Sequence, residues 1–275
     1  IDHLFILCAT GCAEITKLPV LKETWISVLL EDDPHHDCEK FLAIERYNFT
    51  GYFFTIDDDI IYPKDYVNTM KKAIDGYCHK AVVSVHGGKL PSKVTDFRTQ
   101  RNGFHFNSGI NQDSYVNIVG TGVTAFHTST VPMLTECMPR HSDLAFAKYC
   151  QKNNIPMIVL KQKSRRFGSL PNPFTLWGSY SNNERLKTTA YASDITWKIH
   201  KLEGQETPTI NAPCNDEIND LKEQKTIIVG KPNQSFINNL LTHFGWTLEK
   251  VNYYNLNNLK GPKTSSSRCC STWIR

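Results

Sequence analysis

The chain has 275 residues, of which 40% are hydrophobic and 21% are charged, as is ordinary for a globular protein with a sizeable core. Its formal net charge of +4 is too small to indicate a nucleic-acid partner, but it is compatible with an anionic substrate or an acidic lipid surface. No stretch approaches the roughly 20 apolar residues that a membrane-spanning helix needs. Nine cysteines without a Cys-x-x-Cys pattern, and a start without the basic residues of a signal peptide, predict reduced thiols and a cytoplasmic protein.

Six short apolar runs have the length and composition of buried strands: residues 4–8, 25–30, 52–56, 81–85, 123–126 and 157–160. Helical patterns lie between some of them. One begins at Pro63 and places Tyr66, Met70 and Ile74 on a single face, and another begins with Ser142 as a cap and reaches Cys150. This alternation predicts an α/β fold with a mostly parallel sheet that has helices on both faces.

Beyond residue 170 the composition changes. Proline, asparagine and charged residues predict loops and a linker over residues 171–220, after a core domain of residues 1–170. A small C-terminal α/β unit, or the start of a further domain, is expected over residues 221–275. It would have strands at 226–229 and 248–254, a helix at 235–244 and a frayed tail from Lys260.

Three consecutive carboxylates, Asp57, Asp58 and Asp59, stand directly after the expected strand 52–56. Mutual repulsion and desolvation both disfavour such a cluster. At the carboxyl end of a buried strand, however, the carboxylates face the crevice in which open α/β sheets bind ligands, and Mg²⁺ and Mn²⁺ prefer oxygen ligands. A solvated acidic turn before the next helix is the alternative.

Further residues of this chain are suited to a binding site. An ammonium group can contact a diphosphate, an imidazole can bind a sugar or a carboxylate, glycines allow close backbone approach, and a carboxylate can accept a proton. Each group also has a purely structural interpretation: a surface lysine for the ammonium group, a core histidine for the imidazole, a β-bulge for the glycines and a helix cap for the carboxylate. A run of basic residues can be a solvated charged face. The candidates are Lys40, His86, Gly120-Thr121-Gly122, Asp143 and the basic run Lys161, Lys163, Arg165 and Arg166.

The segment FTIDDDIIYPKDYV resembles the DxD segment of nucleotide-sugar glycosyltransferases of the GT-A fold, and more particularly the bacterial capsule enzymes that add N-acetylglucosamine to heparosan. Four further segments resemble motifs of this family in the family's order: Asp37-Cys-Glu-Lys40-Phe41, Val85-His86-Gly87, Gly120-Thr121-Gly122 and Ser142-Asp143-Leu-Ala-Phe146. The resemblance covers residues 1–167, with Glu39 where the family has glycine. The chain begins at the family's second strand, so we expect the first strand–helix unit to be absent or to belong to a longer protein.

The resemblance implies a Rossmann-like GT-A fold and the metal-dependent transfer of a hexosamine from a UDP-sugar to an anionic polysaccharide acceptor. It implies Asp59 as the first ligand of Mn²⁺ or Mg²⁺, with Asp57 as a further ligand or ribose contact, and Asp143 and His86 as catalytic residues. The residues expected to bind substrate or nucleotide are Asp57, Asp58, Lys40, Gly120, Thr121, Gly122, Arg165 and Arg166.

Two other functions remain open. A catalytically inactive glycan-binding or scaffold subunit of a polysaccharide synthase would bind polymer without transferring a sugar. For the transferase as well as for this subunit, association with a synthase partner or with the inner face of the membrane stays open. A metal-dependent phosphotransferase would use the same acidic strand end to transfer phosphate. The mass of the product distinguishes these functions.

Overall fold

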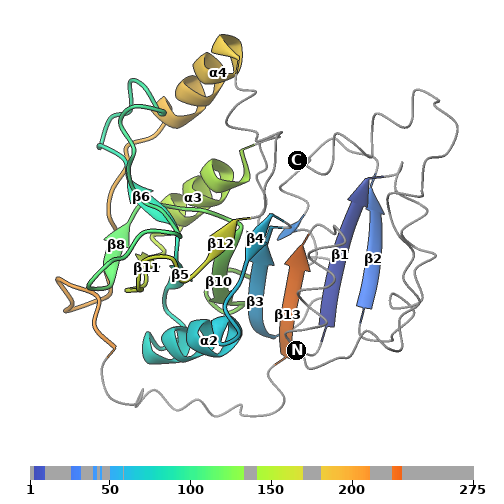
Figure 1. The fold of residues 1–275 in the computed structure, drawn as a ribbon. Helices are drawn as coiled ribbons and strands as arrows, with labels where there is room; N and C mark the ends of the chain where they lie inside the picture. Colours follow the sequence, from blue (N-terminus) through green and yellow to red (C-terminus); the bar gives the residue numbers. More distant parts are fainter. Residues whose placement is uncertain are drawn as a thin grey trace, which may run out of the picture.

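The computed structural model describes residues 3–9, 26–31, 40–41, 44, 50–57, 59–132, 141–169, 181–210 and 225–230. Its centre is an eight-stranded sheet with the strand order β2-β1-β13-β3-β10-β5-β11-β8 (Figure 1). All of these strands except β8 lie on apolar runs that the sequence marks as strands. They span His3–Ala9 (β1), Ile26–Glu31 (β2), Gly51–Ile56 (β3), Val82–Ser84 (β5), Ser114–Val116 (β8), Val123–His127 (β10), Met157–Val159 (β11) and Lys225–Gly230 (β13).

The sheet is mixed, so the prediction of a mostly parallel sheet is wrong. Strand β10 runs antiparallel to both of its neighbours, β3 and β5, and β8 runs antiparallel to β11, while the other neighbouring strands pair in parallel. A parallel connection needs a crossover of a dozen or more residues, usually a helix. Residues 85–122, all of them described, contain no helix between β5 and β10. Instead β6 (Gly87–Lys89), β7 (Asn102–Phe104) and β9 (Ile118–Val119) form a separate three-stranded sheet.

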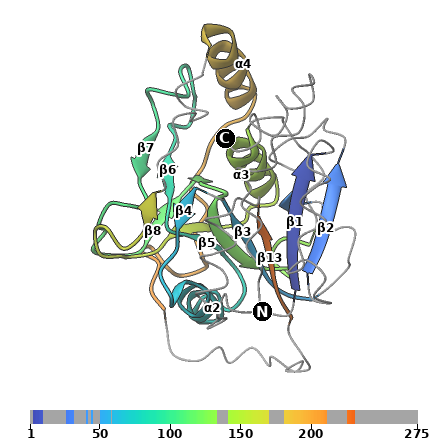
Figure 2. The same cartoon turned by 45° about the vertical axis from the view of Figure 1, so that its right-hand side comes forward.

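Strand β13 lies between β1 and β3 and pairs in parallel with both (Figure 2). Ile227 is opposite His3 on one side and opposite Phe53 on the other. The strand expected at residues 226–229 therefore lies inside the main sheet, next to strands from the beginning of the chain. The other elements expected near the C-terminus, at 235–244 and 248–254, lie outside the described residues.

Helices cover both faces of the sheet, as the sequence predicts. Successive residues of a strand point to opposite faces. In β3, Phe54 packs in one apolar cluster with Met70 of α2 (Tyr66–Gly76), and Phe53 packs in a second cluster with Phe146 of α3 (Ser142–Lys152). Helix α2 begins three residues after the expected Pro63. Ser142 is the first residue of α3 and not its cap, a position that His141 takes.

A further helix, α4 (Asn182–Ser193), lies in the segment that the composition predicts to be a linker. Ser181 and Glu184 form a capping box at its start, a sequence signal that the composition of the segment obscures. Lys148 of α3 is buried, and its Nζ lies 2.6 Å from Asp194 Oδ2 and 3.6 Å from the centre of the Tyr191 ring. These contacts hold the end of α4 against α3, and Figure 2 shows the two helices on the same side of the molecule.

The remaining short strands and the thiols complete the described structure. Strand β4 (Ile60–Ile61) pairs with β12 (Gly168–Ser169). Cys78 takes part in a disulfide bond, so the expectation of reduced thiols is not met at this residue. Cys150 is a buried free thiol, and burial raises its pKa. Among the described residues, no helix has both the length and the apolar character needed to cross a membrane.

Candidate active site

Asp57 and Gly122 face each other at one edge of the main sheet. Asp57 directly follows β3 and Gly122 directly precedes β10, and in this antiparallel pair Ile56 lies opposite Val123. A Cβ atom on residue 122 would lie only 2.2 Å from Asp57 Oδ2. Glycine at position 122 therefore makes the space that the Asp57 carboxylate occupies.

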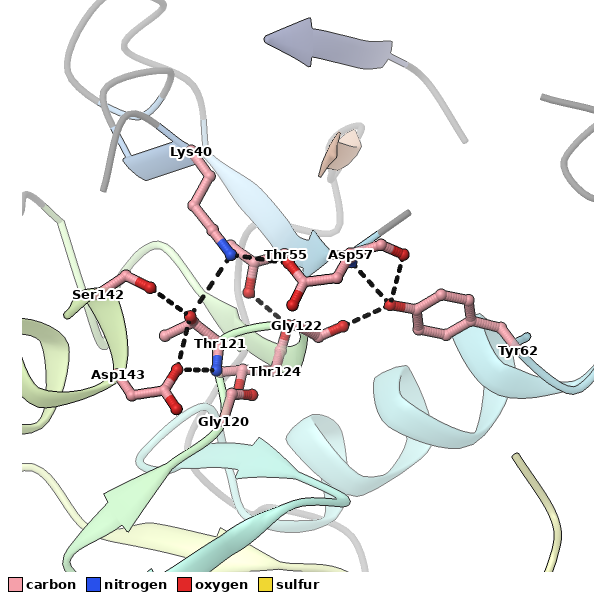
Figure 3. A network of polar contacts seen from close by, with 10 residues as sticks. All are labelled: Lys40, Thr55, Asp57, Tyr62, Gly120, Thr121, Gly122, Thr124, Ser142 and Asp143. Atoms are coloured by element: carbon pink, nitrogen blue, oxygen red, sulfur yellow. Dashed lines mark hydrogen bonds and ion pairs between the residues drawn. The ribbon is translucent and has the colours of Figure 1, made fainter. Parts of the chain in front are cut away.

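Lys40 is the buried counter-ion of Asp57. Its Nζ lies 3.0 Å from Asp57 Oδ1 and 3.4 Å from Thr121 Oγ1, and the residue is 4% exposed (Figure 3). The next residue, Phe41, stacks on Phe146 of α3 with ring centres 4.9 Å apart. This packing anchors the backbone that carries the ammonium group, so Lys40 is not the solvent-facing lysine of the alternative interpretation.

Asp143 holds the backbone of the glycine-rich segment. Its Oδ1 accepts hydrogen bonds from Thr121 N at 2.7 Å and from Thr121 Oγ1 at 2.8 Å. The threonine hydroxyl has one proton, so when it donates to Asp143 it accepts from Lys40 and from Ser142 Oγ, which is 2.8 Å away. Figure 3 shows the resulting polar chain from Asp57 through Lys40 and Thr121 to Asp143.

His86 lies beside the same segment. The main-chain carbonyl of His86 accepts a hydrogen bond from Gly120 N at 2.9 Å, and a Cβ atom on residue 120 would lie 3.0 Å from His86 Cγ. Burial, followed by the charges of Arg101 and His105, lowers the pKa of His86 to about 3. The imidazole is therefore neutral near pH 7. In this state it can donate a hydrogen bond to a ligand or accept one from it, but it carries no positive charge.

Tyr62 connects the acidic turn to the glycine-rich segment, and the sequence did not identify it. Its hydroxyl lies 2.5 Å from the carbonyl oxygen of Gly122, to which it donates, and it accepts from Asp57 N at 2.8 Å. Burial raises the pKa of Tyr62, and the charges of Asp57 and Asp59 add to this effect. Both carboxylates thus act on one hydroxyl. Asp58 lies outside the described residues.

The described residues include no group of three or more His, Cys, Asp and Glu side chains placed to hold a metal ion. Asp57 and Asp59 would supply two carboxylates at most, and water and substrate oxygens would have to complete the coordination. Mg²⁺ and Mn²⁺ bind in this way when one or two carboxylates and the phosphates of a nucleotide share the ion. The carboxylates of Asp57 and Asp59 are of the ligand type that Mg²⁺ and Mn²⁺ prefer.

The basic run contacts other parts of the chain. Arg166 Nη2 lies 2.8 Å from Asp65 Oδ2 and 3.0 Å from Thr69 Oγ1, at the start of α2. Arg165 has a φ of 60°, in the left-handed region, and its N–H donates to the carbonyl of Asn107 at 3.0 Å. None of these contacts involves the polar chain from Asp57 to Asp143, so the structure does not bring Arg165 and Arg166 together with the other expected site residues.

No protein-family model matches this chain, and no curated protein matches it significantly. The function therefore has to be inferred from the site. Its main feature is that segments far apart in the sequence meet there: Lys40 is separated from Asp57 by 17 positions and from Thr121 by 81.

Proposed function

We propose that this protein is a metal-dependent glycosyltransferase of the GT-A fold that moves a hexosamine, N-acetylglucosamine in the first instance, from a UDP-sugar to an anionic polysaccharide acceptor. One observation supports this above all. The five sequence segments that resemble the family's motifs contribute neighbouring residues to one site: Asp57, Lys40, Thr121 and Asp143 in a single polar chain, and His86 against Gly120.

Asp59 and Asp57 are the residues that would hold Mn²⁺ or Mg²⁺. When bound, the cation would neutralise the negative charge that develops on the diphosphate as the sugar leaves. Lys40 fixes the orientation of Asp57 through its ion pair, and Tyr62 fixes the backbone just after β3 and just before β10 through its hydrogen bonds with Asp57 and Gly122. These contacts hold the ligands in place before any substrate binds.

Asp143 is the residue that we propose acts on the acceptor or on the sugar. Thr121 donates two hydrogen bonds to the Oδ1 atom of Asp143. Within the described part of the chain, the Oδ2 atom of Asp143 makes no hydrogen bond. That oxygen can accept the proton of an acceptor hydroxyl or stabilise positive charge on the transferred sugar. We therefore assign to Asp143 a role in transfer, in addition to its hold on Thr121.

A second function, an inactive glycan-binding subunit, is favoured by a different observation. The ammonium group of Lys40 already neutralises Asp57, one of the two expected metal ligands. An ion pair at this carboxylate opposes the binding of a cation to the same group. A chain with a weak metal site could retain acceptor binding and lack transfer.

The experiment that tests the proposal is a donor screen. The full chain is incubated with Mn²⁺, a heparosan oligosaccharide and each of a panel of UDP-sugars, and the products are weighed by mass spectrometry. We expect the oligosaccharide to gain one hexosamine from a single donor, and the gain to disappear with a chelator. An Asp143→Asn preparation serves as the control for contaminating enzymes.

The other outcomes assign the other functions. An oligosaccharide that binds without any gain in mass would contradict the transferase and support the glycan-binding subunit. A gain of one sugar phosphate or of one UMP group would support a phosphotransferase, because attack at either phosphorus atom of a UDP-sugar transfers one of these groups.

A further inference from the structure

The ribbon formed by β6 and β7 carries a second polar cluster beside the site. Gly88 lies opposite Gly103 in the antiparallel register, so His86 and His105 stand opposite each other just beyond one end of the ribbon. Their ring centres are 5.1 Å apart. Because alternate residues of a strand share a face, Arg101 lies on the same face as Gly103 and His105.

Gly88 leaves room for the side chain of Arg101, which crosses this face of the ribbon. A Cβ atom on residue 88 would lie 3.1 Å from Arg101 Cγ and 3.3 Å from Arg101 Nε. The charge of Arg101 acts on both imidazoles: after burial, it is the largest cause that lowers the pKa of His86 and of His105. The cluster thus brings one permanent cation together with two imidazoles on one face of the ribbon.

Arg101 Nη2 is buried and has no hydrogen-bond partner among the described residues. Arg101 also forms no ion pair with any carboxylate in the described part of the chain, although Lys148, Arg166 and Arg185 each do. An unsatisfied charged donor in a buried position is unfavourable, and such a group is explained when a ligand supplies the missing acceptor. An anionic acceptor would accept from Nη2 and also compensate the guanidinium charge.

We infer that Arg101, together with His86 and His105, binds an oxyanion of the substrate, and we assign this oxyanion to the carboxylate of an acidic sugar in the acceptor. The planar guanidinium group has two parallel N–H donors that match the two oxygens of a carboxylate. This assignment rests on the proposed function. A phosphate has the same chemistry, but the expected metal ligands Asp57 and Asp59 follow β3, and a diphosphate would accompany the metal there.

Calorimetry without donor sugar tests the inference. The full chain is titrated with a heparosan oligosaccharide, with a neutral N-acetylglucosamine oligomer of equal length, and, in a separate arm, with UDP and Mn²⁺. Arg101→Gln should weaken binding of the acidic oligosaccharide by about tenfold or more, the effect of losing a charge-assisted hydrogen bond, and should leave the neutral oligomer unaffected. Arg98→Gln, which removes the same charge from an exposed residue three positions away, is the matched control and should bind as the wild type does.

The two arms distinguish the sources of the oxyanion. A loss of UDP binding in Arg101→Gln, with unchanged oligosaccharide binding, would mean that Arg101 does bind an oxyanion but that this oxyanion is a phosphate of the nucleotide. Unchanged binding of both ligands would overturn the inference. Failure of sugar transfer alone would contradict the proposed function and would leave this site intact, because calorimetry without donor does not depend on transfer.

A measurement on the wild-type chain covers the case in which Arg101→Gln does not fold. With isotopically labelled histidine, addition of the acidic oligosaccharide at constant pH should shift the imidazole signals of His86 and His105. The signals of His79 and His127, which stack on each other elsewhere in the fold, should not move. Shifts confined to His79 and His127, or no shifts at saturating ligand, would overturn the inference.

Discussion

Gly122 lies so close to the Asp57 carboxylate that a methyl group at position 122 would fall 2.2 Å from Asp57 Oδ2. The carboxylate cannot turn away without losing Lys40, which holds Oδ1 at 3.0 Å. Gly122→Ala is therefore expected to displace Asp57 and to weaken Mn²⁺-dependent UDP binding by about 10- to 100-fold, the usual effect of disturbing the support of a metal ligand. Calorimetry with UDP, with and without Mn²⁺, measures this change.

Gly103→Ala is the matched control for that substitution. A Cβ atom there meets nothing nearer than the Gly87 carbonyl at 3.5 Å, an ordinary van der Waals distance. Its UDP binding should equal that of the wild type. If Gly122→Ala also binds UDP and Mn²⁺ normally, the position of Asp57 does not matter to the metal.

Asp59→Asn and Asp143→Asn should fail in different ways. Asparagine keeps the size of aspartate but loses its charge, so at position 59 it should weaken metal binding and, with it, metal-dependent UDP binding. At position 143 the nucleotide complex should form normally, while turnover falls by about 100- to 10,000-fold, as expected for a lost general base. UDP affinity with Mn²⁺ and turnover are measured for both variants.

Either variant can refute its own assignment. Normal affinity for Mn²⁺ and UDP in Asp59→Asn would show that the acidic turn is not the metal site. Normal turnover in Asp143→Asn would reduce Asp143 to the residue that positions Thr121.

Arg166 is expected to stabilise the fold through Asp65. The two side chains lie 2.8 Å apart and join the segment before β12 to the start of α2, and the hydrogen bond from Arg166, followed by its charge, lowers the pKa of Asp65. Because Asp65 is largely exposed, a double-mutant cycle with Arg166→Gln and Asp65→Asn should give a coupling free energy of only about 0.2–1 kcal/mol. Urea unfolding of the four proteins measures it. A coupling near zero combined with a raised acceptor Michaelis constant in Arg166→Gln would instead favour acceptor binding.

Acid should destabilise the protein through His127. This residue is 4% exposed, and burial followed by the charge of His79 lowers its pKa to about 4. Between the ordinary histidine pKa of about 6.5 and this value, the unfolded chain binds a proton that the folded chain does not. The free energy of unfolding should therefore fall as the pH decreases from 6.5 towards 4.

His127→Gln should remove about 1–3 kcal/mol of this pH dependence. His86, whose pKa is lowered to about 3, contributes in the same direction, so a residual slope should remain. Urea unfolding at pH 7 and at pH 4.5 measures the difference. An unchanged slope in the variant would show that His127 does not titrate as described.

Strand β13 should be needed for the order of β1 and β2. It pairs with β1 on one side and with β3 on the other, so β1 and β2 join the rest of the sheet through it. A chain that ends at residue 210 lacks β13 and exposes two strand edges, which favours aggregation. Hydrogen exchange should show protection of residues 3–9 and 26–31 in the full chain and its loss in the shortened one. Equal protection would mean that β1 and β2 pair stably without β13.

Local patterns were enough to locate most of the secondary structure. Apolar runs of strand length mark β1, β3 and β10, and apolar residues at helical spacing mark the buried face of α2. A helix that buries one face needs apolar residues at the spacing of that face, and this spacing is visible in the sequence. The direction of β10 was missed although the absence of a helical pattern before it was a usable signal. The helix α4 was missed because loop-like composition outweighed the capping box at Ser181 and Glu184.

The sequence alone determined which residues have the chemistry of a site: carboxylates after a strand, a lysine, a threonine between glycines and an aspartate at the start of a helix. Only the tertiary structure decided that Lys40 neutralises Asp57, that Asp143 binds Thr121 and that Arg166 contacts α2. These pairs are separated in the chain by 17, 22 and, for Arg166 and Asp65, 101 positions. Their contacts depend on how the helices and strands pack, and no periodic pattern within one segment encodes a distance to another segment.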